Sequence, residues 1–140
     1  MIKTIVEIFQ LDAKTGKIKN YQKTHNVVLT SGKNEFWKEG RNFRSIGIGT
    51  DDTTPDASQT GLLAEVKKEY AGDLRSRSDN VVTIEHTFKD WTSSYTIKEA
   101  GIVLGSGVND YSYFNRATFS GVTVDANNNI KIKFTVTVTD

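Results

Sequence analysis

The sequence has no cysteine, one proline and one methionine among its 140 residues. Without cysteine the chain can form neither a disulfide nor a thiolate metal site. We therefore expect it to be made in a reducing cytoplasm. A chain of this length buries about two-thirds of its unfolded surface, so we expect a single domain that needs no covalent cross-link.

An excess of charge of one sign is also lacking, since 18 basic residues face 17 acidic ones. Proteins that bind nucleic acid usually carry a basic excess that neutralises phosphates, so the composition predicts no nucleic-acid partner. No apolar run reaches the length of a membrane span. Residues 1–7 contain Lys3 and Glu7 and lack the uncharged apolar stretch of a signal peptide. We expect no membrane partner.

The dominant pattern in the sequence is an alternation of apolar and polar residues. Apolar residues occupy every second position from Ile130 to Val138, with lysine and threonine between them, and residues 80–89 alternate in the same way. Period-two alternation is typical of a half-buried strand. Further strand-like segments lie at 2–11, 17–29, 43–49, 65–78, 95–104 and 111–119. The sequence predicts a mainly β protein, an antiparallel β-sandwich of about seven or eight strands with one short helix.

We predict one β-sandwich domain over residues 1–140. It comprises an N-terminal hairpin at 1–29, a short helix at 30–40 and the main sandwich at 43–139. We also expect one helical turn at 59–64 and a break in the strand near Ala100. Gly72 predicts a bulge or kink, since glycine inside a strand often marks one.

The predicted helix has a recognisable beginning and end. Thr30 or Ser31 is a suitable N-cap, because a hydroxyl oxygen can accept a hydrogen bond from a free amide of the first turn. Phe36 and Trp37 are its expected core residues, and Gly40 its expected stop.

No pattern in the sequence indicates catalysis. A serine–histidine–acid triad needs a serine whose proton a histidine can accept, and neither His25 nor His86 lies in a nucleophile motif. A structural role is favoured for both, with His86 on an apolar strand face. The doublet formed by Gly47 and Gly49 around Ile48 is better explained by close backbone packing than by phosphate binding. We predict no enzyme, no catalytic residue and no cofactor.

Two loops carry enough oxygen ligands to be considered as metal sites. Asp51, Asp52 and Asp56 could converge on a cation, although a solvated loop is the favoured interpretation. The stretch at 125–129 imitates the opening of a calcium-binding loop, but Ile130 stands where that loop needs glycine. A tight asparagine-rich turn is favoured there, and we predict no metal site.

Several short motifs occur in an order that resembles a known family. Residues 96–102 read TIKEAGI, and residues 113–119 read YFNRATF. They follow a loop with IGT at 48–50, Pro55, TGL at 60–62 and EV at 65–66. This order covers roughly residues 45–139. It resembles a small β-rich module of tailed-bacteriophage virions, the particle-proximal part of phage tail-fibre and tail-collar proteins.

The resemblance implies a structural component of the virion, in the tail, collar or baseplate, as an adaptor or decoration subunit. It implies that the partners are copies of the chain itself, as a trimer or hexamer, and other virion proteins. Because the sequence ends at Asp140 without a fibrous shaft or receptor-binding tip, direct receptor binding is not expected. A capsid decoration (cement) protein is one alternative.

A carbohydrate-binding β-sandwich on the virion surface is another alternative, with a glycan as partner. Trp37, Trp91 or loop tyrosines would then form the stacking platform. Aromatic residues are also common interface anchors, and the interface candidates are Trp91, Tyr95, Tyr111 and Tyr113. Core packing is the alternative for each of them and is favoured for Trp91. We also expect Glu99, in an apolar strand, to pair with Arg116 or Lys98.

Overall fold

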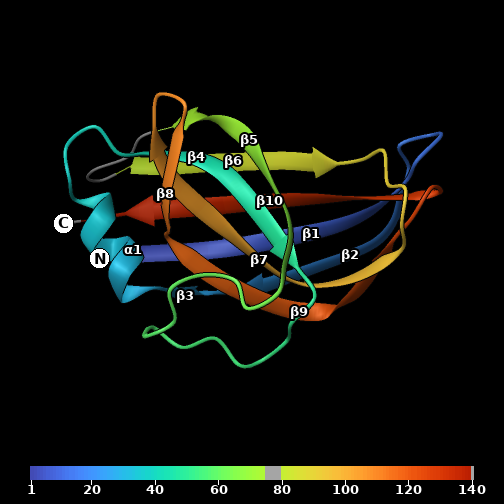
Figure 1. The fold of residues 1–140 in the computed structure, drawn as a ribbon, viewed down its shortest axis with the longest axis horizontal. Helices are drawn as coiled ribbons and strands as arrows, with labels where there is room; N and C mark the ends of the chain where they lie inside the picture. The colour runs from blue at the N-terminus through green and yellow to red at the C-terminus, as the bar shows by residue number, and fades with distance from the viewer. Residues whose placement is uncertain (75–79, 140) are drawn as a thin grey trace.

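The computed structural model describes residues 1–74 and 80–139 as two antiparallel sheets packed face to face (Figure 1). The predicted mainly β sandwich with one short helix is confirmed. The first sheet has four strands in the order β2-β1-β10-β6. Their bounds are Ile2–Asp12 for β1, Ile18–His25 for β2, Asn80–Phe88 for β6 and Asn128–Val138 for β10.

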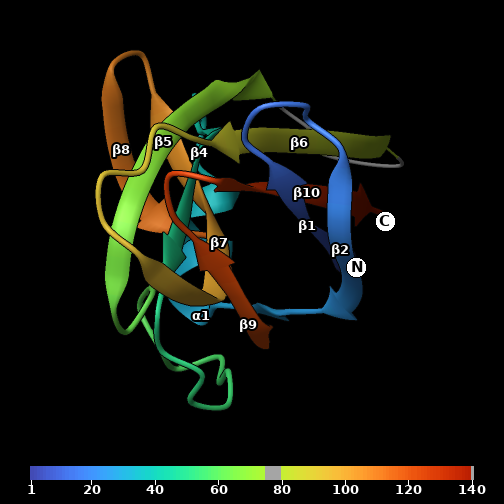
Figure 2. The same cartoon turned by 90° about the vertical axis from the view of Figure 1, so that its right-hand side faces the viewer.

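The second sheet has six strands, in the order β3-β9-β7-β4-β5, with β8 paired to β7. Their bounds are Val27–Val28 for β3, Asn42–Gly49 for β4, Glu65–Leu74 for β5, Tyr95–Ser106 for β7, Asn109–Tyr113 for β8 and Asn115–Val124 for β9. The helix α1 spans Thr30–Phe36. Figure 2 shows the two sheets nearly end on, and in Figure 1 α1 lies at the end of the sandwich where both termini are found.

The alternating pattern of the sequence sets which side chains enter the core. Along β10 every second residue from Ile130 to Val138 is buried, while the lysines and threonines between them are partly exposed. β1 pairs with β10 over its whole length, from Ile2 opposite Val138 to Asp12 opposite Asn128. Its inward residues, such as Val6 and Ile8, therefore meet the same core.

Two predicted strands are each divided in two, so the described residues contain ten strands. The segment predicted at 17–29 divides at Asn26 into β2 and β3, and the segment predicted at 111–119 divides at Phe114 into β8 and β9. At the second break the Phe114 amide donates to the Ile102 carbonyl at 2.7 Å, and the Phe114 carbonyl accepts from Leu29 at 2.9 Å. The Phe114 ring is fully buried, so core packing of this ring accompanies the break.

The helix is shorter than predicted, and three details of the prediction are wrong. Leu29 is the N-cap residue, and no side chain caps the helix. Helix α1 ends at Phe36, before Gly40. Phe36 is buried and stacks on Phe43 at 5.4 Å, whereas Trp37 is 51% exposed.

Three further expectations concern the loops and strands. The bulge at Gly72 is confirmed, because its φ is 140° and the register between β4 and β5 shifts beside it. The break expected near Ala100 is wrong, since β7 continues through it. The helical turn expected at 59–64 is also wrong, because that segment contains no helix. Among the described residues no helix is long and apolar enough to cross a membrane.

Candidate functional site

The most unusual chemical group in the fold is a fully buried ion pair. Glu99 on β7 and Arg116 on β9 are both 0% exposed, and Arg116 Nε lies 2.9 Å from Glu99 Oε1. The sequence-based expectation that Arg116 or Lys98 would pair with Glu99 is confirmed for Arg116. Lys98 instead lies beside Asp52, with its Nζ 3.8 Å from the carboxylate.

The Glu99 carboxylate accepts hydrogen bonds from both ends of the loop at residues 50–64. Oε1 accepts from the Leu63 amide at 2.9 Å, in addition to Arg116. Oε2 accepts from the Ala64 amide at 2.8 Å and from the Asp51 amide at 3.1 Å. All four of these donors are N–H groups, so the carboxylate stabilises a loop that has no helix or strand of its own.

Arg116 holds the middle of the same loop. Its Nη1 donates to the Thr53 carbonyl at 2.6 Å and to Gln59 Oε1 at 3.2 Å. Its Nη2 donates to the carbonyl and to Oδ1 of Asp51, both at 3.3 Å. Since a guanidinium is always charged and has five donors in a fixed plane, one side chain satisfies five acceptors at once.

Small residues allow the loop to approach the sheet this closely. A Cβ at Gly49 would lie 2.3 Å from the Ala64 carbonyl oxygen and 2.4 Å from Glu99 Oε2. No side chain fits at those distances. The close backbone packing predicted for the glycine doublet is therefore confirmed.

Tyr113 packs beside this network, in a cradle of three glycines. A Cβ at Gly47 would lie 1.9 Å from the Tyr113 hydroxyl oxygen, at Gly101 2.9 Å from its ring and at Gly61 3.0 Å from its ring. The hydroxyl donates a hydrogen bond to Glu65. Burial, together with this bond, raises the pKa of the Tyr113 phenol well above its usual range.

The three predicted metal candidates have separate partners and do not converge. Asp51 accepts from Arg116, and hydrogen bonds from Thr53, with the nearby guanidinium, lower the pKa of its carboxyl. Asp52 lies beside Lys98, as noted above. Asp56 accepts from the Ser58 amide at 2.8 Å. Within residues 1–74 and 80–139 no group of three histidine, cysteine or acidic side chains could hold a metal ion.

The two histidines lie in different settings. His86 on β6 contacts Glu69 on β5, with Nε2 2.8 Å from Oε1, and packs edge-on against Phe88. The contact joins an edge strand of one sheet to an edge strand of the other. His25 is exposed at the end of β2.

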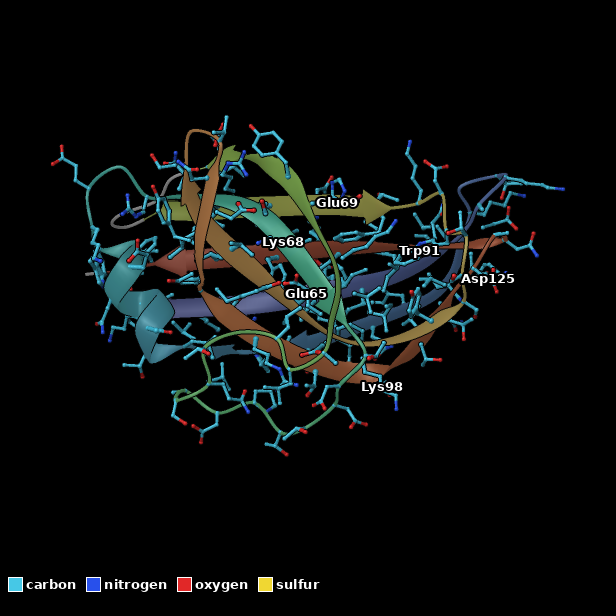
Figure 3. All side chains as sticks on the ribbon, in the orientation of Figure 1. Glu65, Lys68, Glu69, Trp91, Lys98 and Asp125 are labelled. Atoms are coloured by element: carbon cyan, nitrogen blue, oxygen red, sulfur yellow. The ribbon has the colours of Figure 1, made fainter. Side chains whose placement is uncertain are left out.

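The aromatic interface candidates differ in exposure. Trp91 is 5% exposed in the core, and its Nε1 donates to the Phe88 carbonyl at 3.2 Å. It lies at the same end of the sandwich as Asp125 (Figure 3). Tyr95 and Tyr111 are 38% and 47% exposed, whereas Tyr113 occupies its glycine cradle. An interface role for these four residues stays a prediction.

The described surface includes a polar groove and an apolar groove. A polar groove of about 390 Å³ lies between β2 and β9, where the Gln22 side chain makes two hydrogen bonds with the Ser120 backbone, at 2.7 and 3.0 Å. An apolar groove of about 540 Å³ lies near the N-terminus and includes Met1, Val28 and Trp37 in its lining. Neither groove adjoins the buried ion pair.

We compared the chain with models of known protein families, with curated proteins and with solved structures, and found no match. We therefore infer a function from the residues described above. Sequence reasoning had identified Glu99 and Arg116 but not their partners at Thr53, Leu63 and Ala64. These partners are backbone groups, which leave no signal in the sequence.

Proposed function

We propose that this chain is a non-enzymatic structural component of a bacteriophage virion. Its station would be the tail, collar or baseplate, where it would act as an adaptor or decoration subunit through contacts with copies of itself and with other virion proteins. Decoration of the capsid surface is the closest variant of the same proposal. The chain would then be located in the virion after synthesis in the host cytoplasm.

The observation that carries the proposal is the convergence of the family-like motifs on one network. The segment at 96–102 contributes Glu99, and the segment at 113–119 contributes Arg116. The groups that these two side chains bind lie at residues 51, 53, 59, 63 and 64, between or next to the motif residues of the preceding loop. The motifs therefore share a physical task, which is to fix a long loop on the second sheet. Residues that hold a loop in one conformation suit a protein that presents surfaces to neighbours.

Self-association as a trimer or hexamer is part of the proposal. The exposed large apolar side chains include Tyr70, Val81 and Tyr111, which lie on or beside edge strands. Edge strands leave backbone donors and acceptors unpaired, and assembly is one way in which proteins cover them. A formal net charge of +1 opposes dense packing of like subunits only weakly.

The direct test is to look for the chain in purified particles. Phage particles from the source of the sequence would be banded by density, and their proteins quantified by mass spectrometry against a labelled copy of this chain. We expect a fixed number of copies per particle, and labelling with a specific antibody and gold should locate them at the tail, collar or capsid surface. Absence from particles, with the chain found only in the soluble lysate, would contradict the proposal.

A carbohydrate-binding role is the second candidate, because Trp37 is half exposed and lines the apolar groove. An exposed indole face beside a groove is a suitable platform for a sugar ring. A glycan array would test this role, with Trp37→Ala as the variant that removes the platform. Binding by the wild type that the variant loses would favour the glycan function, and absence of binding by both would exclude this platform.

A further inference from the structure

The outer face of the four-stranded sheet is not covered by any other element of the described chain. In Figure 2 the second sheet and α1 lie on one side of this sheet only. Its central strands, β1 and β10, present half-exposed side chains to the other side. A second copy of the chain could cover this face in a protein proposed to self-associate.

A row of four charges of alternating sign crosses this face. The register places Lys23 on β2 opposite Glu7 on β1, Glu7 opposite Lys133 on β10, and Lys133 opposite Glu85 on β6. The order across the sheet is therefore positive, negative, positive, negative. Cross-strand pairs of opposite charge stabilise the sheet itself, but this order also has a symmetry that matters between molecules.

We propose that two copies of the chain pack through this face and are related by a two-fold axis. The axis lies in the interface between the two copies, runs parallel to the strands and passes over the line midway between β1 and β10. Rotation about that axis reverses the order of the row, so each charge faces one of opposite sign. Lys23 faces Glu85 of the second copy, and Glu7 faces Lys133 of the second copy. The contact is isologous, since the same patch serves both copies.

Neighbouring rows fit the same operation. Phe9 lies opposite Lys131 in the register, so the rotation places each of them against the other in the second copy. Within one chain Lys131 Nζ already lies 5.4 Å from the centre of the Phe9 ring, a cation–π contact that the second copy can repeat. On the other side of the charged row, Ile5 lies opposite Thr135. The rotation therefore places Ile5 of each copy against Thr135 of the other, so two half-exposed β-branched side chains meet at the centre of the interface.

The size and twist of the face are suitable for a dimer. Four strands of eight to eleven residues, spaced about 4.8 Å apart, cover about 600 Å² per copy, or about 1,200 Å² in total, the lower end of standard interfaces. Aligned sheets pack with their strands rotated by about 30°. At about 7 Å from the axis this rotation displaces a row by about 3.6 Å, or one residue, which lysine and glutamate side chains can span.

This inference deepens the self-association part of the proposed function, but does not require a virion location. A dihedral hexamer would contain such two-fold contacts, whereas a simple trimer would not.

The test uses a variant in which all four charges are reversed, Lys23→Glu, Glu7→Lys, Lys133→Glu and Glu85→Lys. The variant keeps the alternation within its own sheet and remains complementary to itself. Against the wild type, however, every charge meets one of the same sign. Native mass spectrometry of an equal mixture with isotope-labelled wild type would count the pairs, after circular dichroism has shown that both proteins are folded.

We expect each protein to form dimers with itself and mixed dimers to be depleted at least about tenfold from the random share, because opposed like charges across an interface cost several kcal/mol. Mixed dimers at half of all dimers would overturn the inference. A wild type that is monomeric at every concentration would overturn it as well. A trimer that mixes at random would overturn it while leaving the homo-oligomeric function standing.

A second pair of variants keeps the test decisive if the reversed protein does not fold. Thr135→Arg places a bulky charge at the centre of the face, and Thr123→Arg places the same charge on exposed β9 of the other sheet. We expect Thr135→Arg to raise the dimer dissociation constant at least about tenfold, since it buries an unpaired charge, and Thr123→Arg to leave it unchanged. Equal constants for both variants would refute the two-fold contact.

Discussion

The substitution Glu99→Gln tests the buried network with a change of almost no volume. Both carboxylate oxygens of Glu99 receive N–H donors, from Arg116 and from the amides of Asp51, Leu63 and Ala64. An amide has only one oxygen, so in either orientation its NH₂ group would face two donors. Arg116 would also lose its buried counter-ion and keep only the partly exposed carboxylate of Asp51.

The expected cost follows from the burial of the pair. Removing one partner of a buried ion pair costs about 3 to 5 kcal/mol, a large part of the roughly 5 to 15 kcal/mol by which a domain is stable. At this chain length about 1 kcal/mol lowers the melting temperature by 3 to 4 °C. We therefore expect Glu99→Gln to melt about 10 to 20 °C below the wild type.

Denaturant unfolding and hydrogen exchange measure this effect independently. The amides of Asp51, Leu63 and Ala64 should lose protection first, because they donate directly to Glu99. Asp52→Asn is the matched control in the same loop, since Asp52 is 68% exposed and its contact with Lys98 is 3.8 Å long. We expect the control to cost at most about 1 kcal/mol. A melting temperature for Glu99→Gln equal to that of the control would refute the assignment of the network as the support of the loop.

Three further predictions concern the core, the glycine cradle and acid. Phe36→Ala should cost about 3 to 5 kcal/mol in a denaturant titration, whereas the adjacent Trp37→Ala should cost less than about 1 kcal/mol, because only Phe36 is buried; similar costs would contradict this. Gly47→Ala should destabilise the fold by about 1 to 3 kcal/mol, since the new Cβ meets the Tyr113 phenol. In a protein that already carries Tyr113→Leu, the same substitution should cost less than in the wild type. Additive costs of the two substitutions would show that the two sites are independent. The pKa of Asp51 is lowered in the folded state, so its stabilising contribution is present above the unfolded pKa and is lost as pH falls through the folded pKa; Asp51→Asn should therefore flatten the acid limb of the stability curve measured from pH 6 to pH 2.

Local sequence patterns correctly predicted strands β10 and β6 of the four-stranded sheet, where apolar and polar residues alternate regularly. Residues 130–138 alternate without a break, and β10 has the predicted inward and outward faces throughout. The prediction agrees with the structure because successive side chains of a strand point to opposite faces of the sheet. In a half-buried strand the apolar positions of the sequence therefore identify the buried face. The same argument predicted β6, where Ile84 and Phe88 are buried and Val81, Thr83 and Glu85 are exposed.

The predictions failed where distant segments decide the local conformation. Trp37 follows Phe36 directly and is equally apolar, yet only Phe36 meets Phe43 and Phe114 in the core. The helical turn expected at 59–64 is replaced by a loop without helix, because the amides of Leu63 and Ala64 donate to Glu99, whereas in a helix they would donate to backbone carbonyls. Propensity within a short window contains no information about such partners.

The sequence by itself determined the β-sandwich class and the inward faces of β6 and β10. It also indicated that Glu99, a charged residue in an apolar strand, needs a partner of opposite sign, but it left Arg116 and Lys98 as alternatives. Only the tertiary structure selected Arg116 and decided what the pair does. The groups that bind this pair are largely backbone amides and carbonyls, at residues 51, 53, 63 and 64. Every residue has such groups, so no sequence pattern indicates which of them will bind the pair. The row of Lys23, Glu7, Lys133 and Glu85 likewise exists only through strand register, because its four members come from four strands that are brought side by side by folding.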